Sequence, residues 1–273
     1  MENSVKELAQ KLVQRAKLLP DGERLLVGIA GVPGAGKSTI AYPLVELVNN
    51  MLGVHVQQHT DVDIDQGLAS PAPNEPGQIT ISVSLDGWHT ARVDLDKMPN
   101  PAEAHRRRGA AFTFDAVEYV SFVSALREKP FPSSIPFRTF SHGKKDPEIS
   151  AQPIEPHHRI IIIEGLYVLL DTEPWNHSTA MLDERIWVEC PDELARERLI
   201  KRHLLTGIET NQTAAEARVD GSDMINGQFI RDYLVKPTCI VNSVVDVKYV
   251  QSIEDLVELQ PKIRETQIHH DMS

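Results

Sequence analysis

Residues 31–38 read GVPGAGKS and match the pattern of a phosphate-binding loop, in which two glycines separated by four residues precede a lysine and a serine or threonine. The glycines let the backbone curl so that its N–H groups point at the phosphates. Lys37 reaches the β and γ phosphates, and the Ser38 hydroxyl can bind Mg²⁺. We expect the nucleotide to contact the whole loop, which comprises Gly31, Val32, Pro33, Gly34, Ala35, Gly36, Lys37, Ser38 and Thr39.

The residues on either side of the loop support this interpretation. Residues 24–30 (RLLVGIA) form an apolar strand pattern, and residues 39–51 (TIAYPLVELVNNM) carry apolar residues at helical spacing. Strand, loop and helix in this order are the context that the motif requires, which disfavours a chance glycine-rich turn. The sequence therefore predicts a bound nucleoside triphosphate with Mg²⁺.

The composition sets further bounds. The chain has 273 residues, enough for one large α/β domain, and we expect residues 1–273 to form a single domain. Its 39 acidic residues outnumber 28 basic ones, and the net charge of -11 argues against a broad nucleic-acid or anionic-membrane surface. The 2 cysteines are too few for a disulfide framework, and no apolar stretch approaches the length of a membrane span. We expect a cytoplasmic protein without nucleic-acid or membrane partners, and leave a homodimer open.

Strand and helix patterns alternate along the chain. We predict a helix within residues 1–22, further strands at 54–59, 79–85, 159–164, 183–189 and 244–250, and further helices at 116–128, 193–203, 213–218 and 223–234. The all-apolar run before Glu164 is typical of a buried parallel strand. The predicted fold class is therefore α/β: a doubly wound, mostly parallel sheet of the P-loop NTPase type, with helices on both faces and the ligand at the strand ends.

Three segments interrupt or follow this alternation. Residues 60–78 are rich in Asp, Pro, Asn and Gly and predict an exposed surface insertion. Residues 193–218 carry several arginines on predicted helices, and the family resemblance described below implies that they form a lid. Residues 261–273 are expected to be a flexible tail, whose histidine pair is weak support for a metal site.

Two acidic residues follow predicted strands, where open α/β sheets bind ligands. Asp86 comes after strand 79–85 and is the first catalytic candidate, because transfer of a γ-phosphoryl group to an alcohol needs a group that accepts the hydroxyl proton. A turn-capping role for Asp86 fits its position equally well. Glu164 ends the buried strand, where a carboxylate can hold the water shell of the metal.

Other polar residues have simple structural explanations. The cluster Arg106–Arg108 is, taken alone, typical of a solvated helix face. Asp115 with Glu118 three residues later fits a helix N-cap better than a ligand site. His142 fits either the polar surface or a substrate contact, and the surface is favoured.

Several separated stretches together resemble one family, the group of uridine kinase, phosphoribulokinase and bacterial-type pantothenate kinase. Besides the phosphate loop, the matching stretches are SLDGWH (84–89), RRGAAFTFD (107–115), FSH (140–142), IIIIEGLYVLL (160–170) and RERLIKRHLLTG (196–207). They follow the family's order and cover most of residues 24–250. Members of this group phosphorylate hydroxyls of small molecules with MgATP.

The resemblance implies a role for each matched residue. Asp86 would act as the catalytic base beside Lys37, and Glu164 would lie near Mg²⁺ with Ser38. The lid residues Arg198 and Arg202 would close over the ATP phosphates. The acceptor would meet a further set of side chains, namely His89, Arg108, Phe114, Asp115 and His142.

The sequence also departs from its relatives. It has DGWH where uridine kinases usually have DSFY, and pantothenate kinases lack a histidine at the place of His89. The closest resemblance is to uridine-kinase-like and fructokinase-like members. We therefore expect a kinase of a small-molecule hydroxyl, with a uridine-like nucleoside as the first acceptor and a sugar, glycerate or pantothenate-like compound as the alternative. A rival of another class is an NTPase switch or a regulatory nucleotide-binding protein.

Overall fold

The computed structural model describes residues 2–54, 62–63, 68–69, 77–131, 133–141 and 143–243. Its centre is a five-stranded sheet in which all neighbouring strands are parallel. The order across the sheet is β4 (Thr80–Ser84), β7 (Ile160–Glu164), β1 (Leu25–Gly31), β8 (Glu184–Glu189) and β9 (Cys239–Asn242). This arrangement confirms the predicted α/β class with a mostly parallel sheet.

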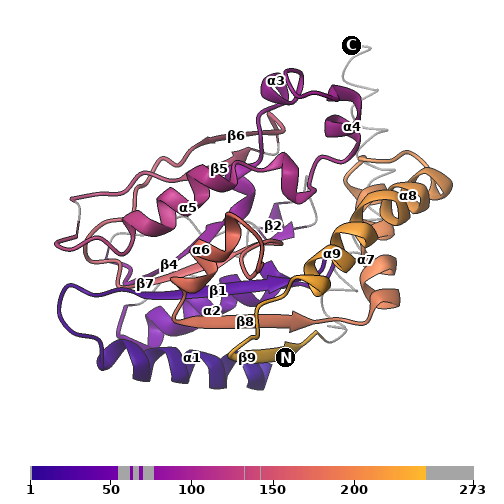
Figure 1. The fold of residues 1–273 in the computed structure, drawn as a ribbon. Coiled ribbons are helices and arrows are strands. Elements are labelled where there is room, and N and C mark those ends of the chain that lie inside the picture. The colour runs from indigo at the N-terminus through magenta and orange to yellow at the C-terminus, as the bar shows by residue number, and fades with distance from the viewer. Residues whose placement is uncertain are drawn as a thin grey trace, which may run out of the picture.

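Strands β1 and β7 lie in the middle of the sheet, and all of their residues are buried. Helices α1 (Glu2–Lys17) and α2 (Lys37–Met51) pack together on one side of the sheet, and α5 (Ala116–Ala125) and α6 (Trp175–Ala180) lie on the other (Figure 1). Parallel strands need this cover on both faces, which explains why β1 and β7 read as continuous apolar runs.

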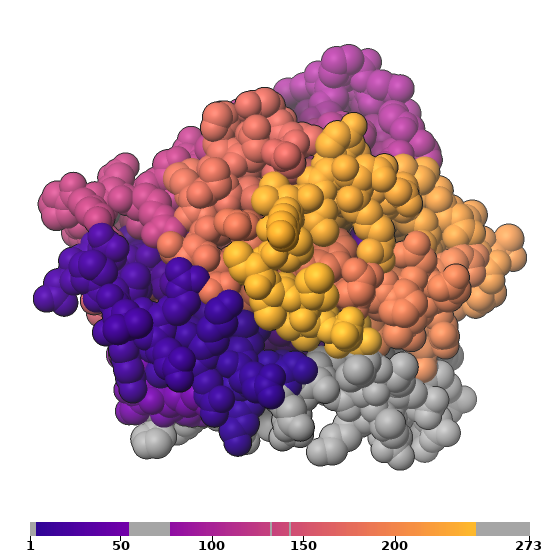
Figure 2. Space-filling view, turned by 60° about the horizontal axis from the view of Figure 1, so that its bottom comes forward, coloured from indigo at the N-terminus to yellow at the C-terminus, as the bar shows by residue number. Residues whose placement is uncertain are grey.

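The N-terminal helix meets the chain that leads into β9. Lys11 and Arg15 of α1 form ion pairs with Glu184, and the Thr238 hydroxyl donates to the same carboxylate over 2.5 Å. Figure 2 shows the indigo and yellow segments side by side on the surface. A single buried carboxylate therefore ties the first helix to the last described strand.

The region predicted as a lid follows β8. It contains α7 (Asp192–Leu205) and α8 (Gln212–Arg218), after which come a π-helical turn (Val219–Asp223) and α9 (Met224–Asp232). The helices α7 and α8 share a small apolar cluster that is separate from the main core and contains Leu199, Ile200, Ala215 and Val219. These helices thus have packing of their own beside the sheet.

Shorter elements connect β4 with β7. They are the 3₁₀ turns Leu85–Trp88 and Ala111–Thr113, the helices α3 (Arg92–Leu95) and α4 (Pro101–Arg106), and an antiparallel hairpin of β5 (Arg138–Ser141) and β6 (Asp146–Ile149). A second small antiparallel pair, β2 (Val62–Asp63) and β3 (Leu68–Ala69), lies in the predicted insertion. None of the described helices combines the length and hydrophobicity that crossing a membrane requires.

Some predicted elements fall outside the described residues. They are the strand at 54–59 apart from Val54, most of the insertion at 60–78, the strand at 244–250 and the tail at 261–273. Strand β9 was not predicted, because its four residues are too few to show a strand period. Nor was the β5–β6 hairpin, which has Lys145 at φ 54° in its connection.

The end of α2 is fixed to the start of β4 by one buried side chain. Asn49 donates from Nδ2 to the Thr80 carbonyl over 2.8 Å, and its Oδ1 accepts from the N–H groups of Ile79 and Thr80 over 3.0 and 2.9 Å. Asn49 thereby holds the helix that starts at the phosphate loop against the strand that ends before Asp86.

Replacing Asn49 should therefore destabilise the protein strongly. We expect Asn49→Leu to lower the free energy of unfolding by about 3 kcal/mol or more, because each buried polar group left without a partner costs about 1–3 kcal/mol. The measurement is urea unfolding followed by circular dichroism. Asn50→Leu, at an exposed position of the same helix, is the matched control. Equal stability of the two variants would show that this link is unimportant.

Candidate active site

The phosphate loop connects β1 to α2 in the way that its sequence predicts. Gly34 and Gly36 have φ angles of 78° and 87°, in the left-handed region that favours glycine. A Cβ atom on Gly34 would lie 2.6 Å from the Ala195 carbonyl oxygen of α7, so no larger residue fits there. The glycine therefore serves the loop conformation and the close approach of α7 together.

Lys37 is the first residue of α2 and folds back over the loop. Its Nζ donates to the carbonyl oxygens of Gly31 and Val32 over 3.2 and 3.3 Å. Burial lowers the pKa of Lys37 to about 8, although the charges of Glu164 and Asp86 act in the opposite direction. The ammonium thus lies inside the loop at a cost in solvation that phosphate oxygens would offset.

The candidate metal ligands Ser38 and Glu164 approach each other from different elements. The Ser38 hydroxyl donates to Oε2 of Glu164 over 3.5 Å. Glu164 is 5% exposed, and burial followed by the charge of Asp86 raises its pKa. Hydroxyl and carboxylate oxygens are ligands that suit Mg²⁺, which commonly takes its remaining ligands from water and nucleotide phosphates. The described residues contain no group of three or more His, Cys, Asp or Glu that could hold a metal by themselves.

Asp86 lies in the 3₁₀ turn directly after β4. The turn is capped by Ser84, whose hydroxyl accepts from the Asp86 N–H over 3.3 Å. The Asp86 side chain is 46% exposed, and its charge acts on both Lys37 and Glu164. The cap of this turn is therefore Ser84 rather than Asp86.

His89 follows at the end of the same turn and packs among aromatic rings. Its Nδ1 lies 2.9 Å from the Asp86 carbonyl oxygen and 3.8 Å from Asp86 Oδ1. The imidazole ring centre lies 4.0 Å from that of Phe114 and 5.1 Å from that of Phe140. Asp86, His89 and Phe114, which the family resemblance implied from two separate stretches of the chain, are therefore close together.

The other predicted acceptor residues have different surroundings. Arg108 donates to the Asp146 carboxylate over 2.8 Å and to the Thr90 carbonyl over 2.9 Å. Asp115 is exposed and caps α5, because its Oδ1 accepts from the Glu118 N–H over 3.0 Å. His142 lies outside the described residues.

Both lid arginines lie near the phosphate loop. Arg198 donates from Nη1 to the Gly34 carbonyl over 3.3 Å and to the Ser243 hydroxyl over 2.8 Å. The charge of Arg202, one turn further along α7, lowers the pKa of Lys37, so the two cations share one region. Three positive groups thus surround the loop.

Two tyrosines in this region were not predicted. The Tyr167 hydroxyl donates to the Gly109 carbonyl over 2.6 Å, and its ring contacts Phe114 with 5.3 Å between ring centres. Tyr42 lies on α2 one turn after Ser38, and burial followed by the charges of Glu164 and Asp86 raises its pKa. The sequence signal was their place in or next to a matched stretch: Tyr167 lies within residues 160–170, and Tyr42 follows the phosphate loop.

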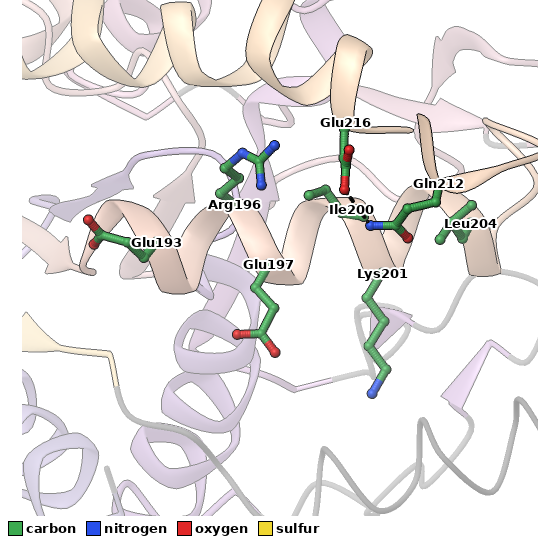
Figure 3. A pocket seen from close by; sticks show the side chains of 8 residues that line it. All are labelled: Glu193, Arg196, Glu197, Ile200, Lys201, Leu204, Gln212 and Glu216. Carbon is green, nitrogen blue, oxygen red and sulfur yellow. Dashed lines mark hydrogen bonds between the residues drawn. The ribbon is translucent and has the colours of Figure 1, made fainter. Parts of the chain in front are cut away.

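A hollow of about 450 Å³ lies on the lid rather than at the phosphate loop. Its walls are side chains of α7 and α8, including Arg196, Glu197, Lys201 and Glu216 (Figure 3). None of the predicted site residues lines it. Its mixture of acidic and basic groups favours no single ligand charge.

Several known proteins are similar to this chain. No protein-family model matches the chain. A candidate uridine kinase of Schizosaccharomyces pombe is 31% identical over 239 residues, which are 88% of this chain and 90% of that protein. The ATP-dependent kinase-like protein notR' of Aspergillus versicolor is 38% identical over 176 residues, 64% of this chain and 100% of its own. Among solved structures, a candidate fructose transport system kinase of Silicibacter sp. TM1040 is 27% identical with a TM-score of 0.69, covering 87% of this chain and 98% of that one.

The lowered pKa of Lys37 predicts proton uptake when ATP binds. With a pKa of about 8, more than half of the Lys37 side chains in the free protein should be neutral at pH 8.5, whereas phosphate oxygens stabilise the charged form. At pH 8.5 we therefore expect ATP to bind with uptake of roughly half a proton or more, and with little uptake at pH 6.5. The measurement is titration calorimetry without divalent metal, in two buffers of different ionisation enthalpy.

Lys37→Ala is the variant that identifies the group. It should bind ATP more weakly and show no proton uptake at pH 8.5, while Lys97→Ala, an exposed lysine after α3, should behave like the wild type. Unchanged uptake in Lys37→Ala would assign the proton to another residue.

Proposed function

The chain belongs to the family of ATP-dependent P-loop kinases that includes uridine-kinase-like proteins, and from this premise we propose that it transfers the γ-phosphoryl group of MgATP to a hydroxyl of a uridine-like nucleoside. The observation that carries this proposal is the convergence of Lys37, Ser38, Glu164 and Asp86 at the ends of β1, β7 and β4. Phosphoryl transfer depends mainly on positioning and on charge stabilisation, and these four groups supply both.

The proposed reaction assigns a separate task to each group. The acceptor oxygen forms a bond to the γ-phosphorus as the bond to the β,γ-bridging oxygen breaks, and ADP leaves with that electron pair. Asp86 accepts the proton of the acceptor hydroxyl. Lys37, together with Arg198 and Arg202, stabilises the charge on the phosphate oxygens. Bound Mg²⁺, held by Ser38 and through water by Glu164, would supply further neutralisation of the phosphates.

A nucleoside is the acceptor that the surroundings of Asp86 favour. His89, Phe114 and Phe140 form an aromatic cluster beside it, and such rings bind flat heterocycles. The S. pombe relative carries the name of a uridine kinase. A sugar is the second candidate, because the Silicibacter protein is described as a fructose transport system kinase.

The acceptor side is tested by ADP formation with a panel of alcohols. We expect slow ADP release with MgATP alone and strong stimulation by uridine, or by another member of a panel with fructose, D-glycerate and pantothenate. Rapid hydrolysis that none of the four alcohols changes would instead support the NTPase switch.

Asp86→Asn tests the proton acceptor. Asparagine keeps the shape of the side chain but cannot accept the proton, so kcat should fall roughly a hundredfold or more, with ATP affinity and melting temperature little changed. The matched control is Asp94→Asn on α3, where the carboxylate pairs with Lys97. A folded Asp86→Asn protein with nearly normal kcat would refute this mechanism, and His89 would become the next base to test.

A further inference from the structure

The three consecutive arginines at the end of α4 differ in their partners. Arg106 forms a bidentate ion pair with Glu103 on its own helix, with distances of 2.8 and 2.7 Å. Arg108 is bound to Asp146. Arg107, between them, donates from Nη2 to the neutral amide oxygen of Asn226 over 2.9 Å and has no ion pair within the described parts of the chain.

The Arg107 guanidinium is half-buried and incompletely bonded. Its Nε is buried and has no hydrogen-bond partner among the described residues. Buried charges are normally paired, and a buried N–H without an acceptor is costly. Arg107 as a whole is only partly buried, and oxygen atoms of a ligand at its exposed part would stabilise the charge.

The contacts of the segment around Arg107 favour the acceptor over the nucleotide as its ligand. Arg107 precedes Gly109, whose carbonyl accepts from the Tyr167 hydroxyl, and the Tyr167 ring contacts Phe114. Phe114 belongs to the aromatic cluster beside Asp86. These contacts link the segment of Arg107 to the side of the site where the acceptor would meet Asp86.

Asn226 connects Arg107 to the phosphate loop. It is 4% exposed on α9, and a Cβ atom on its neighbour Gly227 would lie 3.5 Å from Val32 of the loop. Asn226 therefore fixes the guanidinium relative to the place where the phosphates would bind.

We propose that Arg107 is a specificity-determining residue that binds the phosphoryl acceptor through two adjacent oxygen atoms, and that Asn226 positions it. The inference rests on the proposed kinase function. A guanidinium presents parallel N–H groups that match a pair of neighbouring oxygens, such as a vicinal diol or a carboxylate. Both a ribose and a hydroxy acid offer such a pair, and acceptor analogues distinguish them.

The first test is steady-state kinetics of Arg107→Gln and Arg107→Lys with the panel alcohol that best stimulates the wild type. We expect the acceptor KM to rise about 30-fold or more in both variants, since one ammonium cannot replace two parallel N–H groups, while the KM for ATP stays within about twofold. Arg106→Gln is the matched control and should leave all constants unchanged. An acceptor KM within twofold of wild type in Arg107→Gln, or an equal loss for ATP, would overturn the proposal.

The second test concerns Asn226 and the two acceptor oxygens. Asn226→Leu should raise the acceptor KM with kcat much less affected, as expected for a positioning residue. With uridine as substrate, removal of the 2′ oxygen in 2′-deoxyuridine should weaken the wild type strongly and Arg107→Gln only slightly. With D-glycerate as substrate, replacement of its carboxylate by an amide should likewise weaken the wild type strongly and Arg107→Gln only slightly. If removal of the acceptor oxygen weakened acceptor binding equally in the wild type and in Arg107→Gln, the result would contradict the paired-oxygen contact.

Failure of the kinase proposal can be told apart from failure of this inference. If no panel alcohol stimulates ADP formation, the proposed function fails. Uridine and D-glycerate are then titrated calorimetrically into the protein with ADP. Binding to the wild type that Arg107→Gln abolishes would support the Arg107 contact, and binding that the variant keeps, or no binding at all, would refute it.

Discussion

The register between β4, β7 and β1 is the constraint on which the whole site depends. Glu164, at the end of β7, is paired with Ser84 on one side and with Ile29 on the other. After Ser84 the chain continues to Asp86, and after Ile29 it continues into the phosphate loop. The register therefore brings Asp86, the loop and Glu164 to the same edge of the sheet. A slip of one residue would turn Glu164 to the opposite face of the sheet. The buried apolar side chains that hold the register therefore also hold the geometry of the candidate site.

Burial disfavours the charged forms of both Lys37 and Glu164, and it therefore shifts their pKa values in opposite directions. It lowers the pKa of Lys37 to about 8 and raises the pKa of Glu164. Each is stabilised in its charged form by a partner of opposite charge, which phosphates and a cation would provide. The chain as a whole has a net charge of -11, yet Lys37, Arg198 and Arg202 gather at the loop. Local cations rather than net charge thus prepare this region for an anionic ligand.

The parts of the molecule that the sequence predicted well are those determined by a few neighbouring residues. The parallel α/β sheet follows from apolar runs, and the cap of Asp115 on α5 follows from Glu118 three positions later. The pairing of Arg108 with Asp146, and the contact of Arg107 with Asn226, join segments that are far apart in the chain. The spacing of three residues accounts for the local pair of Arg106 with Glu103, but no local pattern indicates the partners of Arg107 and Arg108, because tertiary packing decides them.

Helix α9 joins the two halves of the site. Its Gly227 approaches Val32 of the phosphate loop, and the adjacent Asn226 holds Arg107. The π-helical turn before α9 ends at Asp223, whose carboxylate lies 2.8 Å from Nε2 of His203 on α7. A nucleotide that orders the loop and α7 would therefore also fix α9, and with it the guanidinium of Arg107. Under the proposed roles, any effect of the nucleotide on acceptor binding through this connection must be matched by an equal effect of the acceptor on nucleotide binding, since coupling between two binding sites is reciprocal.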